Sequence, residues 1–153
     1  MRHSSELAKA SYSGKPGASS EYSSQYGVAN AFQPDLDKFW TTKGNGVPAT
    51  VWYHFDYTFT LARISFSPRP VSWAQVPKTF DVIGSDDCSN WHVLKSVTNS
   101  EFSESGQTNS WDIPCESQKP YECYGIRATR TVAGGSMLSL TNIQMSQRAL
   151  SLL

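Results

Sequence analysis

The chain has 153 residues, the length of one domain, which can bury roughly 70% of the surface that its unfolded form exposes. Thirteen Lys and Arg balance thirteen Asp and Glu, so there is no positive excess to neutralise a phosphate backbone, and we expect no nucleic-acid partner. No apolar run approaches the about 18 residues of a membrane-spanning helix, and the first residues do not form an apolar signal segment.

The first thirty residues are rich in Ser, Gly and Tyr, a composition that favours turns and exposed loops over helix. We therefore predict a long surface loop in this part of the chain. Residues 27–32 can form one helical turn, which Pro34 limits because proline lacks an amide hydrogen and crowds the preceding turn. Helix content should be low.

From residue 51 the pattern changes to period two. Valine or an aromatic residue occupies every second position up to Phe59, which predicts a strand with its rings on one face. Turn clusters rich in Gly, Ser and Asp separate further short β-type runs at 62–66, 79–83, 91–94, 110–113, 124–128 and 137–140. Strands at this spacing, with almost no helical period, predict an all-β fold, an antiparallel sandwich or barrel.

Three cysteines rule out a dense disulfide scaffold, and an odd count leaves at least one of them unpaired within the chain. Cys115 and Cys123 flank a short Pro-containing stretch that could bring two strand ends together. A bridge between them and reduced, buried thiols are equal alternatives. The spacing is not C-x-x-C and no His lies nearby, which disfavours a zinc site.

Several segments, taken in chain order, resemble a known family. They are residues 31–40 (AFQPDLDKFW), 52–56, 64–69, 80–91 (FDVIGSDDCSNW), 124–127 and 138–143. Together they are similar to the discoidin domain, the type C module of coagulation factors V and VIII, within the galactose-binding-like superfamily. The resemblance implies an antiparallel jelly-roll β-sandwich over residues 8–147. A flexible N-terminal extension (1–7) and a C-terminal tail (148–153) would flank it.

The resemblance also implies a type of function, because domains of this fold bind ligands with loops at one end of the sandwich. Those loops would come from residues 12–26, 41–48, 69–76 and 129–136. Our leading hypothesis is a non-catalytic module that recognises a glycan or glycoprotein. Protein–protein adhesion or scaffolding and peripheral phospholipid binding at a membrane surface are the alternatives, since fold does not choose among them. We expect an extracellular or cell-surface location, with an intracellular one left open.

Arg69 and Trp73 are the first candidates for ligand contacts. They lie in a loop bounded by prolines, and an indole ring with a guanidinium suits the apolar face and hydroxyls of a sugar. Trp73 has two other interpretations: insertion into lipid acyl chains, or packing back onto the sandwich. Arg127 and Arg130 are candidates for a second cation at this rim, with exposed strand charges as the plainer alternative.

Weaker candidates lie in the first loop, where Tyr12, Lys15 and Tyr22 are placed to contact a ligand. Tyrosine is also the natural residue for bracing a long loop, so a structural role is the alternative. The other four tryptophans lie on or beside periodic strands or at family core positions, which predicts packing for Trp40, Trp52, Trp91 and Trp111.

The resemblance raises the question of calcium, because many galactose-binding-like domains hold a structural Ca²⁺ with oxygens from the 31–40 region and a Glu in the last strand. Here Gln33, Pro34 and Lys38 depart from that pattern, and Asn142 and Gln144 lie where the Glu is usual. Neutral amides lower the charge of such a site. We predict no calcium, no other metal and no cofactor.

Catalysis also finds no support in the sequence. None of the three histidines belongs to a Ser–His or Cys–His motif. The acidic pairs Asp35 with Asp37 and Asp86 with Asp87 lie in turn contexts, where Asp closes loops. We therefore predict no catalytic residues and no enzymatic activity.

Overall fold

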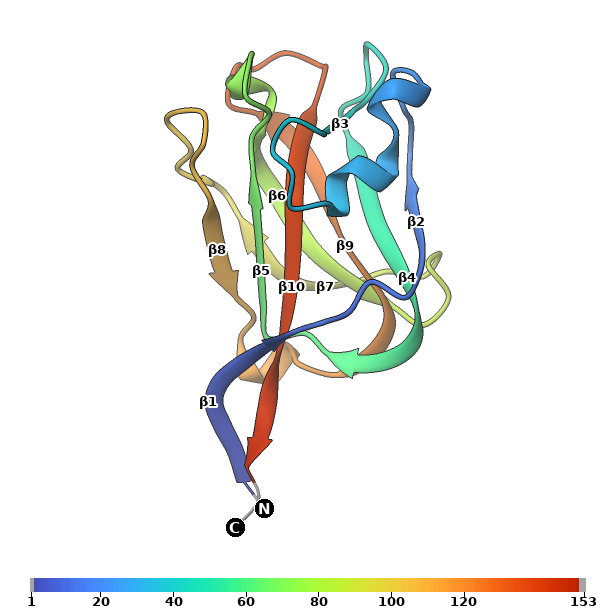
Figure 1. Ribbon diagram of the computed structural model, residues 1–153, viewed down its shortest axis with the longest axis vertical. Coiled ribbons are helices and arrows are strands. Elements are labelled where there is room, and N and C mark those ends of the chain that lie inside the picture. The colour runs from blue at the N-terminus through green and yellow to red at the C-terminus, as the bar shows by residue number, and fades with distance from the viewer. Residues whose placement is uncertain (1, 152–153) are drawn as a thin grey trace.

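A computed structural model describes residues 2–151 as two antiparallel sheets of five strands, packed face to face, with four short 3₁₀ turns (Figure 1). The first sheet contains β1 (Arg2–Lys9), β10 (Ser139–Ser151), β5 (Arg63–Ser67) and β8 (Asn109–Asp112), with β3 (Trp40–Thr41) paired to β10. The second runs in the order β2 (Gly14–Ala18), β4 (Ala49–Thr60), β9 (Pro120–Thr131), β6 (Pro77–Ser85) and β7 (His92–Val97). The predicted all-β antiparallel sandwich with little helix is confirmed.

The alternating pattern from residue 51 forms the centre of this structure. In β4, Val51, Tyr53, Phe55 and Phe59 are buried, and the residues between them are more exposed. Aromatic rings from both sheets complete the core, and Trp40, Tyr124, Phe55, Phe66 and Phe80 are among its largest fully buried side chains. The predicted helical turn is present as the 3₁₀ turn η2 (Val28–Phe32). No helix within residues 2–151 is long and apolar enough to cross a membrane.

The four tryptophans predicted to pack divide into two groups. Trp40 is fully buried, and Trp111 packs on the rings of Phe66 and Phe80 with centroids 4.9 Å away. Trp52 and Trp91 are half-buried and contact each other, with ring centroids 5.9 Å apart. Trp40 and Trp111 therefore pack in or against the core, whereas Trp52 and Trp91 pack on each other at its edge and, like Trp111, are only half-buried.

The expectation of a long loop in the first thirty residues is wrong in part, because β2 lies within it. Gly14 pairs with Phe55 and Ala18 pairs with Val51, which makes β2 the edge strand beside β4. An edge strand tolerates Pro16, since its missing amide hydrogen is not needed there. At Gly14 a side chain would collide with the carbonyl of His54, so the glycine permits the close approach of the two strands.

The two ends of the described chain also pair with each other. β1 lies antiparallel to β10, with Arg2 opposite Ser151 and Lys9 opposite Ser146. The two strands form an arm that projects from the sandwich, at the lower end of Figure 1. The domain boundaries at residues 8 and 147 stay a prediction.

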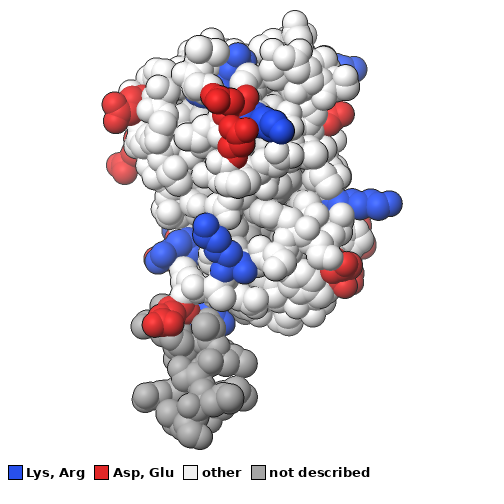
Figure 2. All heavy atoms as spheres, viewed as in Figure 1, with Lys and Arg blue, Asp and Glu red and all other residues white. Residues whose placement is uncertain are grey.

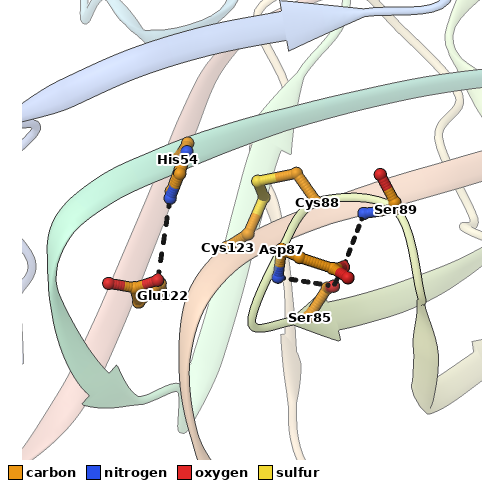
Figure 3. Close-up of polar contacts among 7 residues, drawn as sticks. All are labelled: His54, Ser85, Asp87, Cys88, Ser89, Glu122 and Cys123. Carbon is orange, nitrogen blue, oxygen red and sulfur yellow. Dashed lines mark hydrogen bonds and ion pairs between the residues drawn. A yellow bond between two sulfur atoms is a disulfide. The ribbon is translucent and has the colours of Figure 1, made fainter.

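The disulfide differs from the pairing considered from sequence. Cys88 bonds to Cys123, with Cα atoms 5.6 Å apart, and Cys115 is an exposed free thiol at the start of η4 (Cys115–Ser117). Cys123 lies inside β9 opposite Ser85 of β6, and the turn after Ser85 folds back to bring Cys88 beside it (Figure 3). Closeness along the chain therefore pointed to the wrong partner.

The turn that carries Cys88 is closed by the carboxylate of Asp87 (Figure 3). Its Oδ1 accepts hydrogen bonds from the amides of Asn90 (2.8 Å) and Ser89 (2.9 Å) and from the hydroxyl of Ser85 (2.8 Å). These bonds, the one from the Asn90 amide above all, hold the pKa of the carboxyl well below its usual range. Asp87 therefore closes a loop, as its turn context predicts.

A second polar centre, at the Tyr124 hydroxyl, joins β4 to β9 inside the sandwich. The hydroxyl donates to the carbonyl of Phe59 at 2.5 Å and accepts from the amides of Tyr121 (3.1 Å) and Leu61 (3.2 Å). Burial is the main cause that raises its pKa to about 12. The phenol thus satisfies backbone groups where β4 ends and β9 begins.

Candidate functional site

Loops from four parts of the chain meet at the end of the sandwich opposite the arm, at the top of Figure 1. Backbone bonds join two of them: the amide of Val47 donates to the carbonyl of Ser136 (3.0 Å), and that of Thr42 to Leu138 (2.9 Å). A third loop is fixed because the amide of Ala133 donates to the carbonyl of Ala74 (2.8 Å). These bonds give the loop end a defined shape.

A cavity of about 250 Å³, which we call the Arg69 cavity, opens among these loops. Its walls are Tyr22, Tyr26, Thr41, Arg69 and Met137. Tyr26 ends the 3₁₀ turn η1 (Ser24–Tyr26), Thr41 ends β3, and Arg69 follows β5. The amide of Tyr22 donates to the carbonyl of Thr41 (2.7 Å), while the Tyr22 side chain is 56% exposed. Two of the residues proposed from sequence, Arg69 and Tyr22, therefore lie together.

Aromatic packing determines the position of Arg69. Its guanidinium carbon lies 4.2 Å above the ring of Phe39, and the Tyr26 ring stacks on that same Phe39 with centroids 5.0 Å apart. One terminal nitrogen, Nη1, donates to Gln75 Oε1 at 3.4 Å. Burial lowers the pKa of Arg69, although a guanidinium stays charged at neutral pH. The charge is thus held in place and partly desolvated.

Polar atoms without partners distinguish this region. Arg69 Nε is buried and forms no hydrogen bond with the described residues, and the same is true of Thr41 Oγ1. Ser139, which pairs with Thr41 between β10 and β3, has a third such atom. A buried polar group left unsatisfied costs about 1–3 kcal/mol. Two of these three atoms belong to residues that line the Arg69 cavity, although the atoms themselves are buried beneath its surface.

Arg130 lies at the same end of the molecule but lines a different cavity, of about 360 Å³. Val47, Thr129 and the segment 134–136 complete its walls. Ser136 and Met137 are neighbours in the chain yet line different cavities. This segment therefore separates Arg130 from Arg69.

Trp73 packs against the hydrophobic core and does not line the Arg69 cavity. It begins the 3₁₀ turn η3 (Trp73–Gln75), and its carbonyl accepts from the amide of Val76 at 3.1 Å. The tip of this loop is Val71, which is 63% exposed. The structure thus places the indole as in the packing alternative, and a role for Trp73 as a sugar platform stays a prediction that this geometry does not support.

The remaining three candidates lie away from both cavities. Arg127 pairs across the second sheet with Asp81, their charged groups 3.8 Å apart, and Lys15 is exposed on edge strand β2. Tyr12 packs against Phe32, Tyr53 and Phe55, and burial raises its pKa. Its hydroxyl donates to the carbonyl of Ile143 at 2.5 Å, as the bracing alternative describes. The structure does not bring these three residues to the site.

Sequence reasoning missed four residues of this region: Tyr26, Phe39, Thr41 and Met137. Tyr26 and Thr41 belong to the predicted loop segments 12–26 and 41–48, so a sequence signal existed for where they lie. Nothing in a sequence reveals that the Thr41 hydroxyl has no partner, because that follows from the pairing of β3 with β10.

No metal centre is apparent in the described part of the chain, which has no group of three or more His, Cys, Asp and Glu side chains placed to hold an ion. Gln144 Nε2 donates to Asn142 Oδ1 (2.8 Å), and Asp35 Oδ1 accepts from the amide of Asp37 (3.0 Å). The amides and acids considered for calcium thus bond within the protein, and absence of calcium binding stays a prediction.

Solved structures share this architecture. A family 32 carbohydrate-binding module of Clostridium perfringens NanJ, in complex with galactose, aligns with a TM-score of 0.70 at 17% identity, covering 87% of this chain and 93% of that chain. CBM32-3 from a family 31 glycoside hydrolase of the same organism aligns with a TM-score of 0.72 at 19% identity, covering 94% and 92%. The CBM32 of AlyQ, in complex with 4,5-unsaturated mannuronic acid, gives 0.68 at 12% identity, covering 86% and 92%. At these identities the likeness establishes the fold.

A comparison with curated protein sequences gives no match. The family model for the F5/8 type C domain matches residues 16–119, well over half of the chain. That match spans β2 to η4 and includes most of the loops that meet around Arg69, in agreement with the resemblance seen in the sequence. The chain belongs to the F5/8 type C (discoidin) domain family.

Proposed function

We propose that this domain is a non-catalytic carbohydrate-binding module that takes a sugar into the Arg69 cavity. The observation that carries the proposal is the guanidinium of Arg69, held over the Phe39 ring in a cavity whose walls include two tyrosines. Sugar hydroxyls both donate and accept hydrogen bonds, and the ring carbons present an apolar face. The cavity therefore offers complements to both parts of a saccharide.

The size of the cavity indicates how much of a glycan it takes. Its 250 Å³ lies below the roughly 300–1,000 Å³ of drug-sized ligand sites, which fits one ring or the end of a chain. The exposed Tyr22 stands at its rim. The Arg130 cavity at the same end leaves room for a second ring of the same glycan.

Ligands of the similar structures support a saccharide over other small molecules. Those structures hold galactose, GalNAc-β-1,3-galactose and 4,5-unsaturated mannuronic acid. A module of this kind usually acts outside the cell, so an extracellular or cell-surface location is part of the proposal. Its partner would be a glycan or a glycoprotein.

A glycan array tests the proposal, with the Tyr22→Ala and Val93→Ala variants in parallel. Tyr22 is 56% exposed, so its removal should leave the fold intact while weakening retention by about tenfold through the loss of ring contact. Val93 is 49% exposed on β7, away from the loops, and serves as the control. Loss of binding in Val93→Ala but not Tyr22→Ala would contradict a site at the loop end and would place it on the sheet, one of the two surfaces that protein–protein adhesion could use.

Membrane binding is a second candidate, favoured by one observation. Val71 and Tyr22, two of the large apolar side chains that are most exposed, both lie at the loop end. Figure 2 shows acidic and basic side chains in small, separate groups on the face viewed, without a broad basic patch there for anionic headgroups. Flotation with phosphatidylserine vesicles separates the two candidates, because a carbohydrate module should stay with the unbound fraction.

A further inference from the structure

We propose that the sugar bound in the Arg69 cavity is an acidic one, whose exocyclic carboxylate pairs with the Arg69 guanidinium. The inference rests on the proposed function and adds the chemical class of the ligand. The Arg69 guanidinium carries a positive charge, and no carboxylate of the described residues forms an ion pair with it.

Arg69 belongs to none of the ion pairs found among the described side chains. Three such pairs join His54 with Glu122, Arg63 with Asp112, and Arg127 with Asp81. The walls of the Arg69 cavity carry no carboxylate either. Glu21 is next to Tyr22 in the chain, but its Oε2 accepts a short bond (2.6 Å) from the amide of Val28 and so serves the start of η2. The site thus presents a positive charge with no negative group of its own.

The guanidinium is also held in position before any ligand arrives. Phe39 lies beneath it and Gln75 accepts from one of its terminal nitrogens, so little side-chain freedom is left to lose on binding. A fixed guanidinium matches the geometry of a carboxylate, with two parallel N–H···O bonds, better than that of a single hydroxyl. Its partial burial strengthens the attraction, because less water screens the two charges.

The other arginines at or near the proposed rim lack this combination. Arg127 already has Asp81 as its partner, and Arg130 is exposed in the neighbouring cavity beside Gly134 and Gly135. Tyr22 adds the complementary part of the site, since its exposed ring can pack on the apolar face of the sugar while Arg69 bonds the acid.

Isothermal titration with matched pairs of sugars tests this inference. Galactose and galacturonic acid, glucose and glucuronic acid, and mannose and mannuronic acid differ only in a hydroxymethyl or a carboxylate at C6. We expect the acid of at least one pair to bind about tenfold tighter than its neutral partner. Raising the salt concentration from about 50 mM to about 500 mM should reduce this difference, because salt screens the ion pair.

Arg69→Gln should remove the preference for the acid while keeping a polar group in the site. Arg148→Gln is the matched control, because it makes the same change of charge at an exposed position of β10 on the arm. Thermal unfolding of both variants verifies that they fold. The salt dependence of the unmodified protein gives a second measurement that needs no variant.

The outcomes separate the two proposals. Equal affinity for the acid and the neutral sugar of each pair, or a preference that survives in Arg69→Gln, would overturn the acidic-sugar inference and leave carbohydrate binding in place. If the folded protein binds neither member of any pair and no glycan on the array, both proposals are wrong.

Discussion

The two ends of the sandwich differ in whether particular buried polar groups have hydrogen-bond partners within the protein. Near the start of β9, the Tyr124 hydroxyl satisfies two backbone amides, and the Asp87 carboxylate closes the turn that carries Cys88. At the loop end, Arg69 and Thr41 keep buried polar atoms without partners. The first arrangement stabilises the fold, whereas the second lies where we propose that a ligand binds. Buried polar groups are thus satisfied at the structural end and in part unsatisfied at the proposed binding end.

Removal of the disulfide should give the largest effect on the structural end. Because Cys88 and Cys123 have a sequence separation of 35, the Cys88→Ser, Cys123→Ser double variant should lower the free energy of unfolding by about 3–4 kcal/mol, measured in urea. Cys115→Ser should change nothing, because that thiol is free and exposed. Sugar affinity should be retained wherever the double variant is folded. A loss of affinity there would show that the two ends depend on each other.

Tyr124→Phe should give the next largest effect. Without the hydroxyl, the amides of Leu61 and Tyr121 lose their partner inside the protein, at a cost of about 2–4 kcal/mol in urea unfolding at pH 7. The ring packing stays the same, so the loss belongs to the hydrogen bonds. A change below about 0.5 kcal/mol would mean that water replaces the hydroxyl.

The same residue predicts an alkaline limit of stability. The pKa of Tyr124 is raised to about 12 in the folded protein against about 10 in the unfolded chain. Its contribution is therefore fully present below pH 10 and is lost as the pH rises from about 10 to 12. Urea unfolding across that range should show stability falling in the unmodified protein and falling less in Tyr124→Phe. Tyr12, whose pKa is raised by burial, adds to the slope in both.

Thr41 and Thr42 are adjacent, both buried, and differ only in whether the hydroxyl has a partner. Thr42 Oγ1 accepts from the amide of Leu138 (3.0 Å), whereas Thr41 Oγ1 has none. Thr42→Val should cost about 1–3 kcal/mol, and Thr41→Val should raise stability by about 1 kcal/mol. Calorimetry of the pair tests this. Destabilisation by Thr41→Val would argue that a water molecule already satisfies the hydroxyl.

We expect the addition of calcium to have no effect on the stability of the protein. With amides at Asn142 and Gln144, where the family resemblance implies a Glu, a calcium site would have a lower negative charge. Millimolar calcium should therefore leave the melting temperature unchanged. A rise of several degrees that a chelator reverses would contradict the prediction.

The sequence predicts most of the fold because period-two burial is a local property. The alternation that begins at Val51 is sufficient to place β4, and the segment 80–91 places β6 and its turn. The sequence does not predict β2, because Gly14 and Pro16 are typical of loops. They form a strand only because they pair with β4. The partner of Cys123 depends in the same way on the register between β6 and β9.

The candidate site is less accessible to sequence reasoning. Arg69 and Tyr22 could be proposed from residue type and loop position, yet 47 positions separate them and only the fold brings them to one cavity. Tyr12 has the same side chain as Tyr22, but its neighbours Phe32, Tyr53 and Phe55 place it inside the protein. Which tyrosine is free to contact a ligand depends on long-range packing.

The pairing of Arg2 with Ser151 also affects how the domain can be attached to anything else. Both strands of the arm leave the body at the end opposite the loops, so a tag, a sensor surface or a neighbouring domain joined beyond the arm would be directed away from the proposed sugar site (Figure 1). Two attachment points at one pole would orient every copy alike. An array of such molecules on a support would present all its cavities outward, ready to engage a multivalent glycan.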